Sequence, residues 1–452
     1  MNTVHSGSTN GHRPNSERSL ALRRAAKASF IGNFIEWFDY ASYGYLVTVI
    51  GYAFFPEADK SVQLLSTYAV FAMSFILRPI GAVVWGAWGD RWGRRWALSW
   101  SILIMSGSTF FIGLLPTYSV IGMASAIGLL VLRMIQGFSA SGEYAGAGTF
   151  LAEYAPPSRR GIYTSLVPAS TACGLLAGSL TVTGMFTVLS DNAINTWGWR
   201  VPFLLAGPLG LIGRYIRVHL EDSPAYQEMR AEMPQEQKTA SWSEPLRLLL
   251  HDHLRETLIT FGVSCLNAVA FYMLLTYMPT YVHEELGFSQ DTSTLATSVM
   301  LVVYIAAIFL MGHLSDSFGR RRMLIAACVA FIVLTIPLFV VMMKAAGMLA
   351  VVILCEIVFA IALTANDGTL ATFLAESFPT NVRYSGFALS FNGANALLGG
   401  TTPFIVTWLI KVTGSSLAPA VYLTVIAMIA MVAILRSRMI HGSELTEDQA
   451  QS

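Results

Sequence analysis

Seven ionisable residues lie inside long apolar stretches of this sequence, where a charge is costly because the surroundings exclude water. Five are acids and two are arginines: Glu36, Asp39, Glu143, Glu356, Asp367, Arg78 and Arg133. If all seven were ionised, they would leave a net charge of −3. Burial and nearby like charges both favour the protonated carboxyl group, whereas arginine keeps its proton. This set of residues predicts proton binding beside fixed cations that hold an anion.

The spacing of these residues places several of them on shared helix faces. Glu36, Tyr40 and Tyr43 follow one another at intervals of four and three residues, which is one face of a helix. Arg133 and Glu143 also share a face, but ten residues separate them. Since that is about 15 Å along a helix axis, we expect the two side chains to meet different partners.

The candidates divide by role. The planar guanidinium binds a carboxylate through two parallel hydrogen bonds, so Arg133 is the first candidate for a substrate carboxylate and Arg78 the second. An equally good alternative for Arg78 is a structural pair with Glu36 or Asp39. The predicted substrate-binding residues are Arg133, Arg78, Tyr40, Tyr43, Gln136 and Asn366.

The predicted proton-coupling residues are Glu36, Asp39, Glu143 and Asp367. The alternative for the first three is a structural hydrogen-bond network that joins their helices. Glu356 is not chosen, because it lies nearer the outer end of its stretch. Further candidates for the lining of a cavity are Tyr144, Asn392 and Asn395.

The composition excludes several classes of protein. Of the 452 residues, 54% are hydrophobic and only 12% are charged, whereas soluble domains carry about 25% charged residues. The net charge of +1 gives no case for nucleic-acid binding. The four cysteines show no CxxC spacing, and no phosphate-binding G-x-x-x-x-G-K-[ST] run occurs. We therefore expect no enzyme, no catalytic or metal-binding residues and no cofactor beyond a proton gradient.

Twelve stretches are long and apolar enough to cross a bilayer as helices. They lie at about 29–54, 64–88, 96–115, 120–154, 162–190, 200–219, 256–282, 293–313, 323–343, 348–377, 385–411 and 416–436. The polar residues 1–28 are expected to form a disordered tail. This organisation predicts an N-terminal six-helix bundle over 29–219, a linker over 220–253, a C-terminal bundle over 254–438 and a short tail over 439–452.

Basic residues predict the orientation of these helices, since they concentrate on the cytoplasmic side. If both termini share one side, that side holds 22 of the 28 lysines and arginines, and the opposite side holds four. The other two, Arg78 and Arg133, lie inside the stretches. We therefore expect both termini in the cytoplasm.

The two halves repeat a motif. The pattern G-x-x-x-D-x-x-G-R-R begins at Gly86 and again at Gly312, 226 residues later. Glu153 and Glu376, which end the fourth and tenth stretches, are 223 residues apart. Two matches at nearly the same offset predict a duplicated six-helix unit.

The repeated motif has the chemistry of a latch between helices. Its first glycine permits close helix approach, its second glycine turns the loop, and its aspartate can cap a helix or pair with an arginine of a neighbouring helix. The alternative is a basic anchor that only sets orientation. The predicted latch residues are Gly86, Asp90, Arg91, Gly93, Arg94, Glu153, Gly312, Asp316, Gly319, Arg320 and Glu376.

The doubled motif resembles the major facilitator superfamily, and further segments are similar to its metabolite:proton symporter family. These segments begin at Gly32, Arg78, Arg133, Trp197 and Phe378. Relatives of this kind include carriers of proline or betaine, α-ketoglutarate, shikimate and aromatic acids. The resemblance implies an all-α integral membrane protein with twelve transmembrane helices in two pseudo-symmetric six-helix bundles.

The resemblance also implies a function. We expect proton-coupled uptake of a small carboxylate-bearing metabolite, either an organic acid or a zwitterion, by a monomer in the cell inner membrane. A uniporter or exporter of the same fold is the alternative. Only 14 residues follow Arg438, without heptads, which lowers the case for the coiled-coil osmosensing of some relatives.

Overall fold

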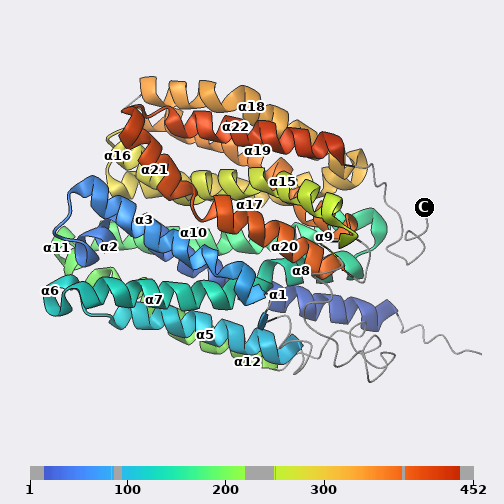
Figure 1. Ribbon diagram of the computed structural model, residues 1–452, viewed down its shortest axis with the longest axis horizontal. Coiled ribbons are helices and arrows are strands. Elements are labelled where there is room, and N and C mark those ends of the chain that lie inside the picture. The colour runs from blue at the N-terminus through green and yellow to red at the C-terminus, as the bar shows by residue number, and fades with distance from the viewer. Residues whose placement is uncertain are drawn as a thin grey trace, which may run out of the picture.

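The computed structural model describes residues 15–82, 84–85, 94–218, 249, 251–345, 347–378 and 382–437. The elements within these ranges are helices, and most of them run along the long axis of the molecule (Figure 1). This confirms the all-α prediction. Because a helix pairs its backbone groups internally, it is the element that apolar stretches of this length form in lipid.

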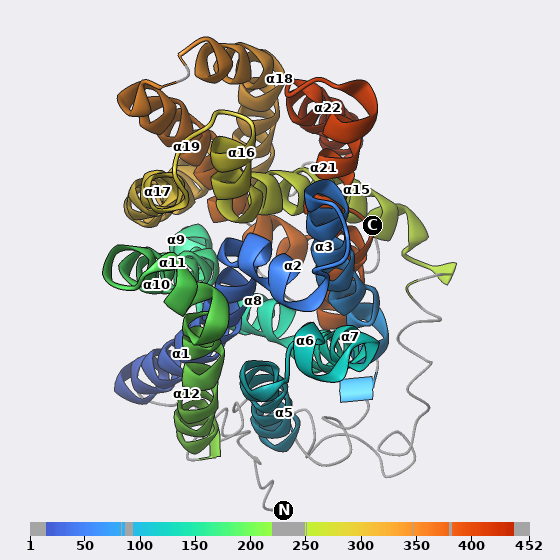
Figure 2. The same cartoon turned by 90° about the vertical axis from the view of Figure 1, so that its left-hand side faces the viewer.

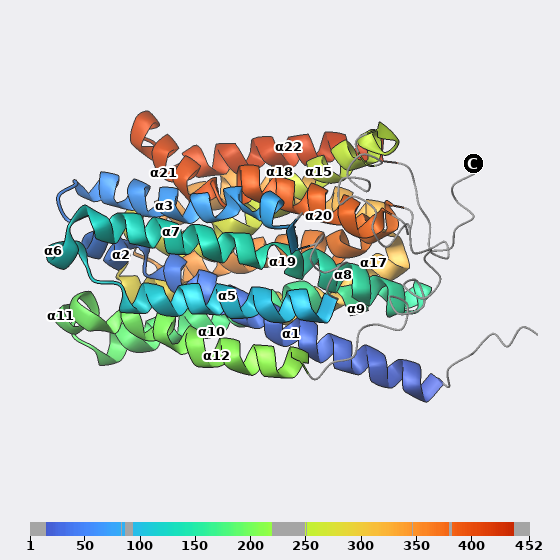
Figure 3. The same ribbon diagram turned by 60° about the horizontal axis from the view of Figure 1, so that its bottom comes forward.

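The first half of the chain forms one group of helices (Figure 2). Within it, α7 lies between α3 and α5 (Figure 3). The elements are α1 (Asn15–Tyr45), α2 (Val47–Phe54), α3 (Lys60–Ile76), α5 (Arg94–Leu114), α6 (Tyr118–Ile121), α7 (Met123–Ser139), α8 (Glu143–Tyr154), α9 (Arg160–Thr164), α10 (Leu166–Val188), α11 (Asp191–Ala193) and α12 (Arg200–Val218).

The second half forms another group, which packs against the first mainly through α17 on α10 and α9, and through α19 and α20 on α8 (Figure 2). Its elements are α15 (Leu254–Phe271), the π-helical turn η5 (Tyr272–Tyr277), α16 (Met278–Glu284), α17 (Gln290–Phe318), α18 (Arg320–Lys344), α19 (Leu349–Glu376), α20 (Arg383–Ala394), the π-helical turn η6 (Asn395–Gly399), α21 (Thr402–Thr413) and α22 (Ala418–Arg436).

Each of the twelve predicted stretches contains a helix. Within the described residues, nine helical segments are long and apolar enough to cross a membrane. The other three predicted spans correspond to α1 with α2, to α5 and to α12. Large apolar side chains lie exposed on the outside, such as Leu310, Val333 and Leu354. Such an apolar surface suits contact with lipid tails.

The structure differs from the sequence-based prediction at the N-terminus. Helix α1 begins at Asn15, so the later half of the segment predicted to be a disordered tail is helical. The physical reason is that this part is rich in alanine, leucine and arginine, which favour helices, and that it continues directly into the first apolar helix.

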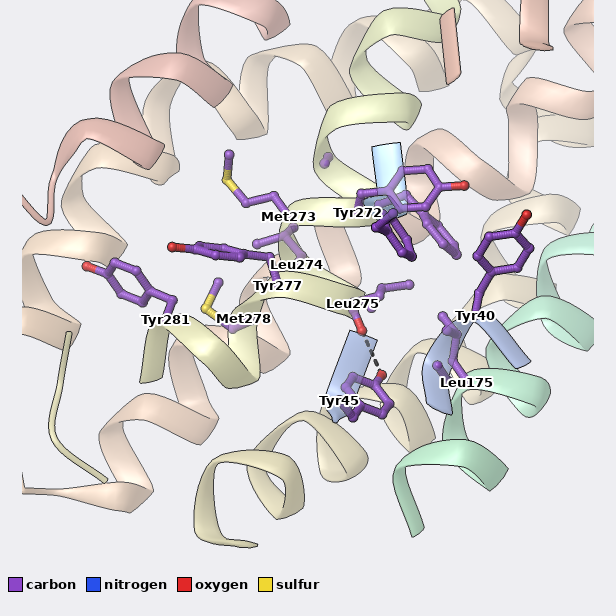
Figure 4. Packing of buried hydrophobic residues seen from close by; sticks show 14 of the residues in the cluster. Tyr40, Tyr45, Leu175, Tyr272, Met273, Leu274, Leu275, Tyr277, Met278 and Tyr281 are labelled. Atoms are coloured by element: carbon purple, nitrogen blue, oxygen red, sulfur yellow. Dashed lines mark hydrogen bonds between the residues drawn. The ribbon is translucent and has the colours of Figure 1, made fainter. Parts of the chain in front are cut away.

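Three spans change their hydrogen-bonding pattern near the middle, namely at the 3-10 turn η1 (Ala140–Gly142), at η5 and at η6. Such interruptions are frequent at functional sites. In η5 the cause is visible: Pro279 has no N–H group, so the carbonyl of Leu275 lacks its usual helical donor. The hydroxyl of Tyr45, from the other half, donates to that carbonyl at 2.7 Å (Figure 4).

Candidate functional site

A small cavity, about large enough for one water molecule, lies between the two halves. Both halves contribute to its wall, from α1, α8 and α10 on one side and from α15, α19, α20 and η6 on the other. The lining residues are Trp37, Tyr144, Pro168, Thr171, Asn267, Phe271, Asp367, Phe391 and Asn395. All three interrupted spans therefore reach the cavity, at Tyr144 just beyond η1, at Phe271 just before η5 and at Asn395 in η6.

Aromatic rings form much of the wall. Tyr144 and Phe391, from opposite halves, stack with ring centroids 4.2 Å apart and planes 4° apart. Trp37 meets Phe271 edge-on across the halves, with centroids 4.9 Å apart. Aromatic faces carry negative charge density, so a ring face that is not covered by another ring attracts a cation placed over it.

Asp367 is the carboxyl group in this wall. Its Oδ1 accepts a hydrogen bond from Asn267 Nδ2 at 2.7 Å, and its Oδ2 accepts one from the Tyr304 hydroxyl at 2.5 Å. Two donors fix the orientation of the group and stabilise a carboxylate. Asp367 is only 1% exposed, and its carboxyl group lies in the same wall as the aromatic rings.

Trp37 brings a hydrogen-bond donor to the same wall. Its indole Nε1 is buried and has no hydrogen-bond partner among the described residues. A buried donor without a partner costs about 1–3 kcal/mol. The neighbouring Thr171 hydroxyl accepts from Asn33 Nδ2 at 2.6 Å, which leaves its own hydrogen available to donate.

The two arginines that were predicted to bind substrate lie away from the cavity lining. Arg78 Nη2 donates to Glu36 Oε1 at 2.7 Å, and both side chains are 3% exposed. Its guanidinium also lies 4.9 Å from the centre of the Tyr40 ring. The structure thus bears out the alternative that Arg78 pairs with Glu36, within the first half of the chain.

Gln136 links Arg133 to Asp39 by hydrogen bonds. Its Nη1 donates to Gln136 Oε1 at 2.5 Å, and Gln136 donates in turn to Asp39, which also accepts from Thr109. The guanidinium lies 4.0 Å from the centre of the Tyr43 ring. Arg133 Nε and Nη2 have no hydrogen-bond partner in the described part of the chain, so these two nitrogens remain available as donors.

Contacts between the halves close the molecule on one side of the cavity, here called the Asp316 end. Asp316 accepts from the backbone N–H groups of Gly161 at 2.8 Å and Ile162 at 3.1 Å. It also pairs with Arg320 at 2.7 Å. Glu376 pairs with Arg160 at 3.4 Å and with Arg320 at 3.5 Å. An aspartate on α17 therefore binds the backbone where α9 begins, in the opposite half.

Two further contacts support this closure. Arg383 pairs with Glu153 across the halves at 3.2 Å. Gly161 and Gly312 approach so closely that a Cβ atom on Gly312 would lie 2.7 Å from the Gly161 carbonyl oxygen. Gly319 adopts a φ of 92° in the turn between α17 and α18, a conformation that favours glycine.

Other contacts close the opposite side, here called the Tyr45 end. Tyr45 donates to the Leu275 carbonyl, and the hydroxyls of Tyr68 and Thr280 share a hydrogen bond of 2.9 Å. Lys60 pairs with Glu284 at 2.9 Å. With both ends joined, the cavity is occluded between them.

Comparison with known proteins decides the family. The sequence model described as Major Facilitator Superfamily matches residues 29–403 and, in a second match, residues 265–449. The chain belongs to the major facilitator superfamily. Its members are transporters, so this protein is a multi-pass membrane transporter and not an enzyme.

Relatives within the superfamily cover nearly the whole chain. The chain is 38% identical to the glycine betaine/proline/ectoine/pipecolic acid transporter OusA of Dickeya dadantii (strain 3937), over 91% of this chain and 82% of that protein. It is 37% identical to the proline/betaine transporter of Escherichia coli (strain K12), with the same coverage. It is 35% identical to the ectoine/proline transporter ProP of Corynebacterium glutamicum, over 92% of this chain and 83% of that one.

Solved structures of the superfamily share the fold. The partially occluded inward open conformation of the xylose transporter XylE from E. coli matches with a TM-score of 0.70 at 19% identity, over 92% of this chain and 97% of that one. The proton:xylose symporter XylE bound to 6-bromo-6-deoxy-D-glucose matches with a TM-score of 0.73 at 20% identity, over 92% and 95%. The predicted twelve-helix major facilitator fold is confirmed.

The structure places the predicted site residues in two groups, those that line the cavity and those that lie elsewhere. Asp367 lines the cavity, as do Tyr144 and Asn395. The predicted ligands and acids that lie elsewhere are Arg133, Arg78, Tyr40, Tyr43, Gln136, Asn366, Glu36 and Asp39, all of them buried. Glu143 begins α8 beside Tyr144 and is partly buried. Their roles in binding substrate or proton stay predictions.

The predicted latch residues also fall into two groups, those with contacts in the structure and those whose contacts are not described. Contacts of Glu153, Gly312, Asp316 and Glu376 with the opposite half are present, and Arg320 pairs with two of these acids. In the first copy of the motif, Gly86, Asp90, Arg91 and Gly93 lie outside the described residues. Arg94 begins α5, and its side chain is not described.

Sequence reasoning missed Trp37, Asn267, Phe271 and Phe391. Aromatic residues in apolar helices usually pack against other helices or lie at the membrane interface, so the rings carried no distinctive signal. Asn267 offered one, since it is a lone amide in the long apolar stretch from Gly262 to Leu275. A polar side chain at such a depth needs a partner, and Asp367 is that partner.

Proposed function

We propose that this protein takes up a small zwitterion with a proton, and that glycine betaine and proline are representative substrates. The observation that carries the proposal is the chemistry of the occluded cavity, which combines aromatic faces, one carboxylate and a donor without a partner. The names of the relatives support the same class, because they transport betaine, proline and ectoine.

The cation end of the site combines Asp367 and Phe391 of the second half with Tyr144 of the first half. A quaternary ammonium group has no N–H to donate, so it is held by charge and by aromatic faces rather than by hydrogen bonds. Asp367 provides the charge, and Phe391 with Tyr144 provides the faces. A lining that includes no arginine among the described residues favours a cation at this position.

The first half provides the carboxylate end. The indole N–H of Trp37 lacks a partner in the described structure, and the Thr171 hydroxyl can donate beside it. Both line the cavity. A substrate carboxylate would satisfy the indole donor and so recover its desolvation cost. The zwitterion then spans the boundary between the two halves. Substrate binding is therefore linked to the movement of the halves towards each other.

Proton coupling follows from the distribution of charge. Arg78 neutralises Glu36, and Arg133 is joined to Asp39 through Gln136. Within the described residues no such cation accompanies Asp367 or Glu356 in the second half. A carboxyl group enclosed without a cation favours proton uptake. Glu36, Asp39, Glu143 and Asp367 remain the proposed coupling residues.

We infer that transport proceeds by alternating access, with the two halves rocking about the cavity. The distribution of basic residues supports the Asp316 end, both termini and the linker over 220–253 in the cytoplasm. On this orientation the Tyr45 end opens to the outside. We propose a monomer in the cell inner membrane, with the lipid bilayer as its surroundings.

Purified protein in liposomes tests this function. With an inside-alkaline pH gradient, labelled glycine betaine and proline should accumulate, and adding substrate without a gradient should make the outside medium more alkaline. Accumulation of betaine without alkalinisation would favour the alternative of a uniporter. Efflux alone would favour an exporter. Absence of any betaine or proline movement would contradict the substrate assignment.

Replacing Trp37 with phenylalanine should raise the KM for betaine about 10- to 100-fold, because a hydrogen bond to a charged group contributes about 1.5–3 kcal/mol. The ring remains, so inhibition by choline, a quaternary ammonium without a carboxylate, should hardly change. Concentration series of uptake measure both. The control is Trp408→Phe, whose side chain is 47% exposed on α21. Equal weakening towards betaine and choline would show that Trp37 acts only through packing.

A further inference from the structure

We propose that Glu356 is a proton-binding site that is filled when the Tyr45 end closes. This inference rests on the proposed proton symport, and it adds a site at one end of the molecule that the coupling residues named above do not include. In the reaction, a proton from the medium at that end joins the carboxylate to give a neutral carboxyl group. The same proton leaves to that medium when the end reopens.

The first step is the isolation of Glu356. Its side chain is fully buried, at 0% exposure, and neither Oε1 nor Oε2 has a hydrogen-bond partner among the described residues. An ionised carboxylate without a hydrogen bond or a cation is strongly disfavoured in an apolar interior, and such a group becomes neutral instead. The occluded conformation therefore holds Glu356 in its protonated form.

The second step concerns its ionisable neighbours. Helix α19 packs against α15, α17, α18 and η5, and the groups that interact with Glu356 are Tyr45 of α1 and Cys355 of its own helix. Neither neighbour is a cation. In the described chain, no cationic group donates a hydrogen bond to either oxygen of Glu356, so no such pair offsets its burial.

The third step is the contrast with Asp367 on the same helix. Eleven residues separate the two acids, which is about 16 Å along the axis. Asp367 accepts two hydrogen bonds, from Asn267 and Tyr304, and lines the cavity. Glu356 lies seven residues after Leu349, nearer the start of α19. The surroundings of the two acids therefore differ: Asp367 can meet the substrate in the cavity, whereas Glu356, outside the lining, can bind a proton alone.

The fourth step connects Glu356 to the closure of the Tyr45 end. Tyr45 donates to the Leu275 carbonyl of η5 (Figure 4) and lies close enough to Glu356 to interact with it electrostatically. Gln290 donates to the Tyr45 carbonyl at 3.4 Å. These bonds join the two halves. Separating them would admit water to Glu356 and stabilise its ionised form. Closure therefore takes up a proton, and a rise in pH favours the open form.

Spin labels on full-length protein test this linkage. The labels are placed at Glu57→Cys and Ser289→Cys, exposed positions at the Tyr45 end in opposite halves, with the four native cysteines replaced. Distance distributions are recorded without substrate between acidic and alkaline pH. If closure binds one proton, each rise of one pH unit should lower the ratio of closed to open molecules by up to about tenfold. In Glu356→Gln, a neutral mimic of the protonated acid, the closed form should persist at every pH.

The controls separate the possible outcomes. Glu356→Asp should keep the pH response, as should Glu285→Gln, which alters a carboxyl group bonded to Ser416 at the same end. If Glu356→Gln does not fold, Glu356→Met, of similar volume, replaces it. A pH response that survives in the Gln or Met variant, or that is absent from the parent protein, would overturn the proposal. Because the readout needs no substrate, failure of betaine uptake would count against the proposed function alone.

Discussion

Asp367→Asn should lower kcat/KM for betaine uptake by at least about 30-fold, because losing one partner of a buried charge pair costs about 2–5 kcal/mol, and each 1.4 kcal/mol is a factor of ten. Asparagine keeps the size of the side chain but removes its charge. It also offers only one oxygen to the two donors, Asn267 and Tyr304, that now bind the carboxylate. The ammonium group of the substrate would then meet aromatic faces without a counter-charge.

Initial rates of uptake in liposomes, over a range of betaine concentrations, measure this effect. The matched control is Asp291→Asn, which removes an acid from the first turn of α17, outside the cavity lining. Gel filtration should show both variants to be folded. Uptake by Asp367→Asn at the rate of the Asp291 variant would show that the cavity does not use this charge.

Gly312→Ala is expected to have the second large effect, on turnover rather than on folding. Its Cβ atom would lie 2.7 Å from both the Gly161 carbonyl oxygen and the Ser165 Oγ, so the Asp316 end could not close fully. Overpacking costs about 1–3 kcal/mol, which would reduce the closed population about 5- to 150-fold. Alanine is also more favourable than glycine inside a helix, by about 1 kcal/mol, so the substitution should not destabilise α17 itself.

The rate of substrate exchange and the rate of net uptake together measure this change. Gly107→Ala is the matched control, since a Cβ atom there meets nothing within 4 Å. We expect normal transport in the control and slow transport in Gly312→Ala, with a similar thermal unfolding temperature in both. Equal turnover in the two variants would mean that close packing at the Asp316 end is not needed for transport.

Most of the fold could be predicted from the local sequence. Each predicted stretch contains a helix, because twenty apolar residues in lipid have few other ways to pair their backbone groups. The duplicated motif also indicated that Asp316 and Arg320 belong to a contact between helices. In the structure Asp316 joins the halves, and Arg320 pairs with Asp316. The N-terminal boundary was wrong, because the helix-forming residues after Asn15 are polar and resemble a tail.

The site depended more on tertiary structure. Of the seven ionisable residues that the sequence places inside apolar stretches, six are buried and Glu143 is partly buried. The sequence left open whether Arg78 pairs with Glu36 or Asp39, and it did not indicate that Gln136 stands between Arg133 and Asp39. Those partners come from different helices, and their pairing depends on how the helices rotate and cross.

What the sequence by itself determined was the class of the protein, its helices, its internal repeat and the residues able to carry charge. The tertiary structure alone decided which side chains share the cavity, as when Trp37 and Phe271 meet across the halves. The physical reason is that lipid-facing and protein-facing positions are both apolar in a membrane helix. Hydrophobic periodicity therefore does not reveal which face is buried, and only packing between distant segments assembles the site.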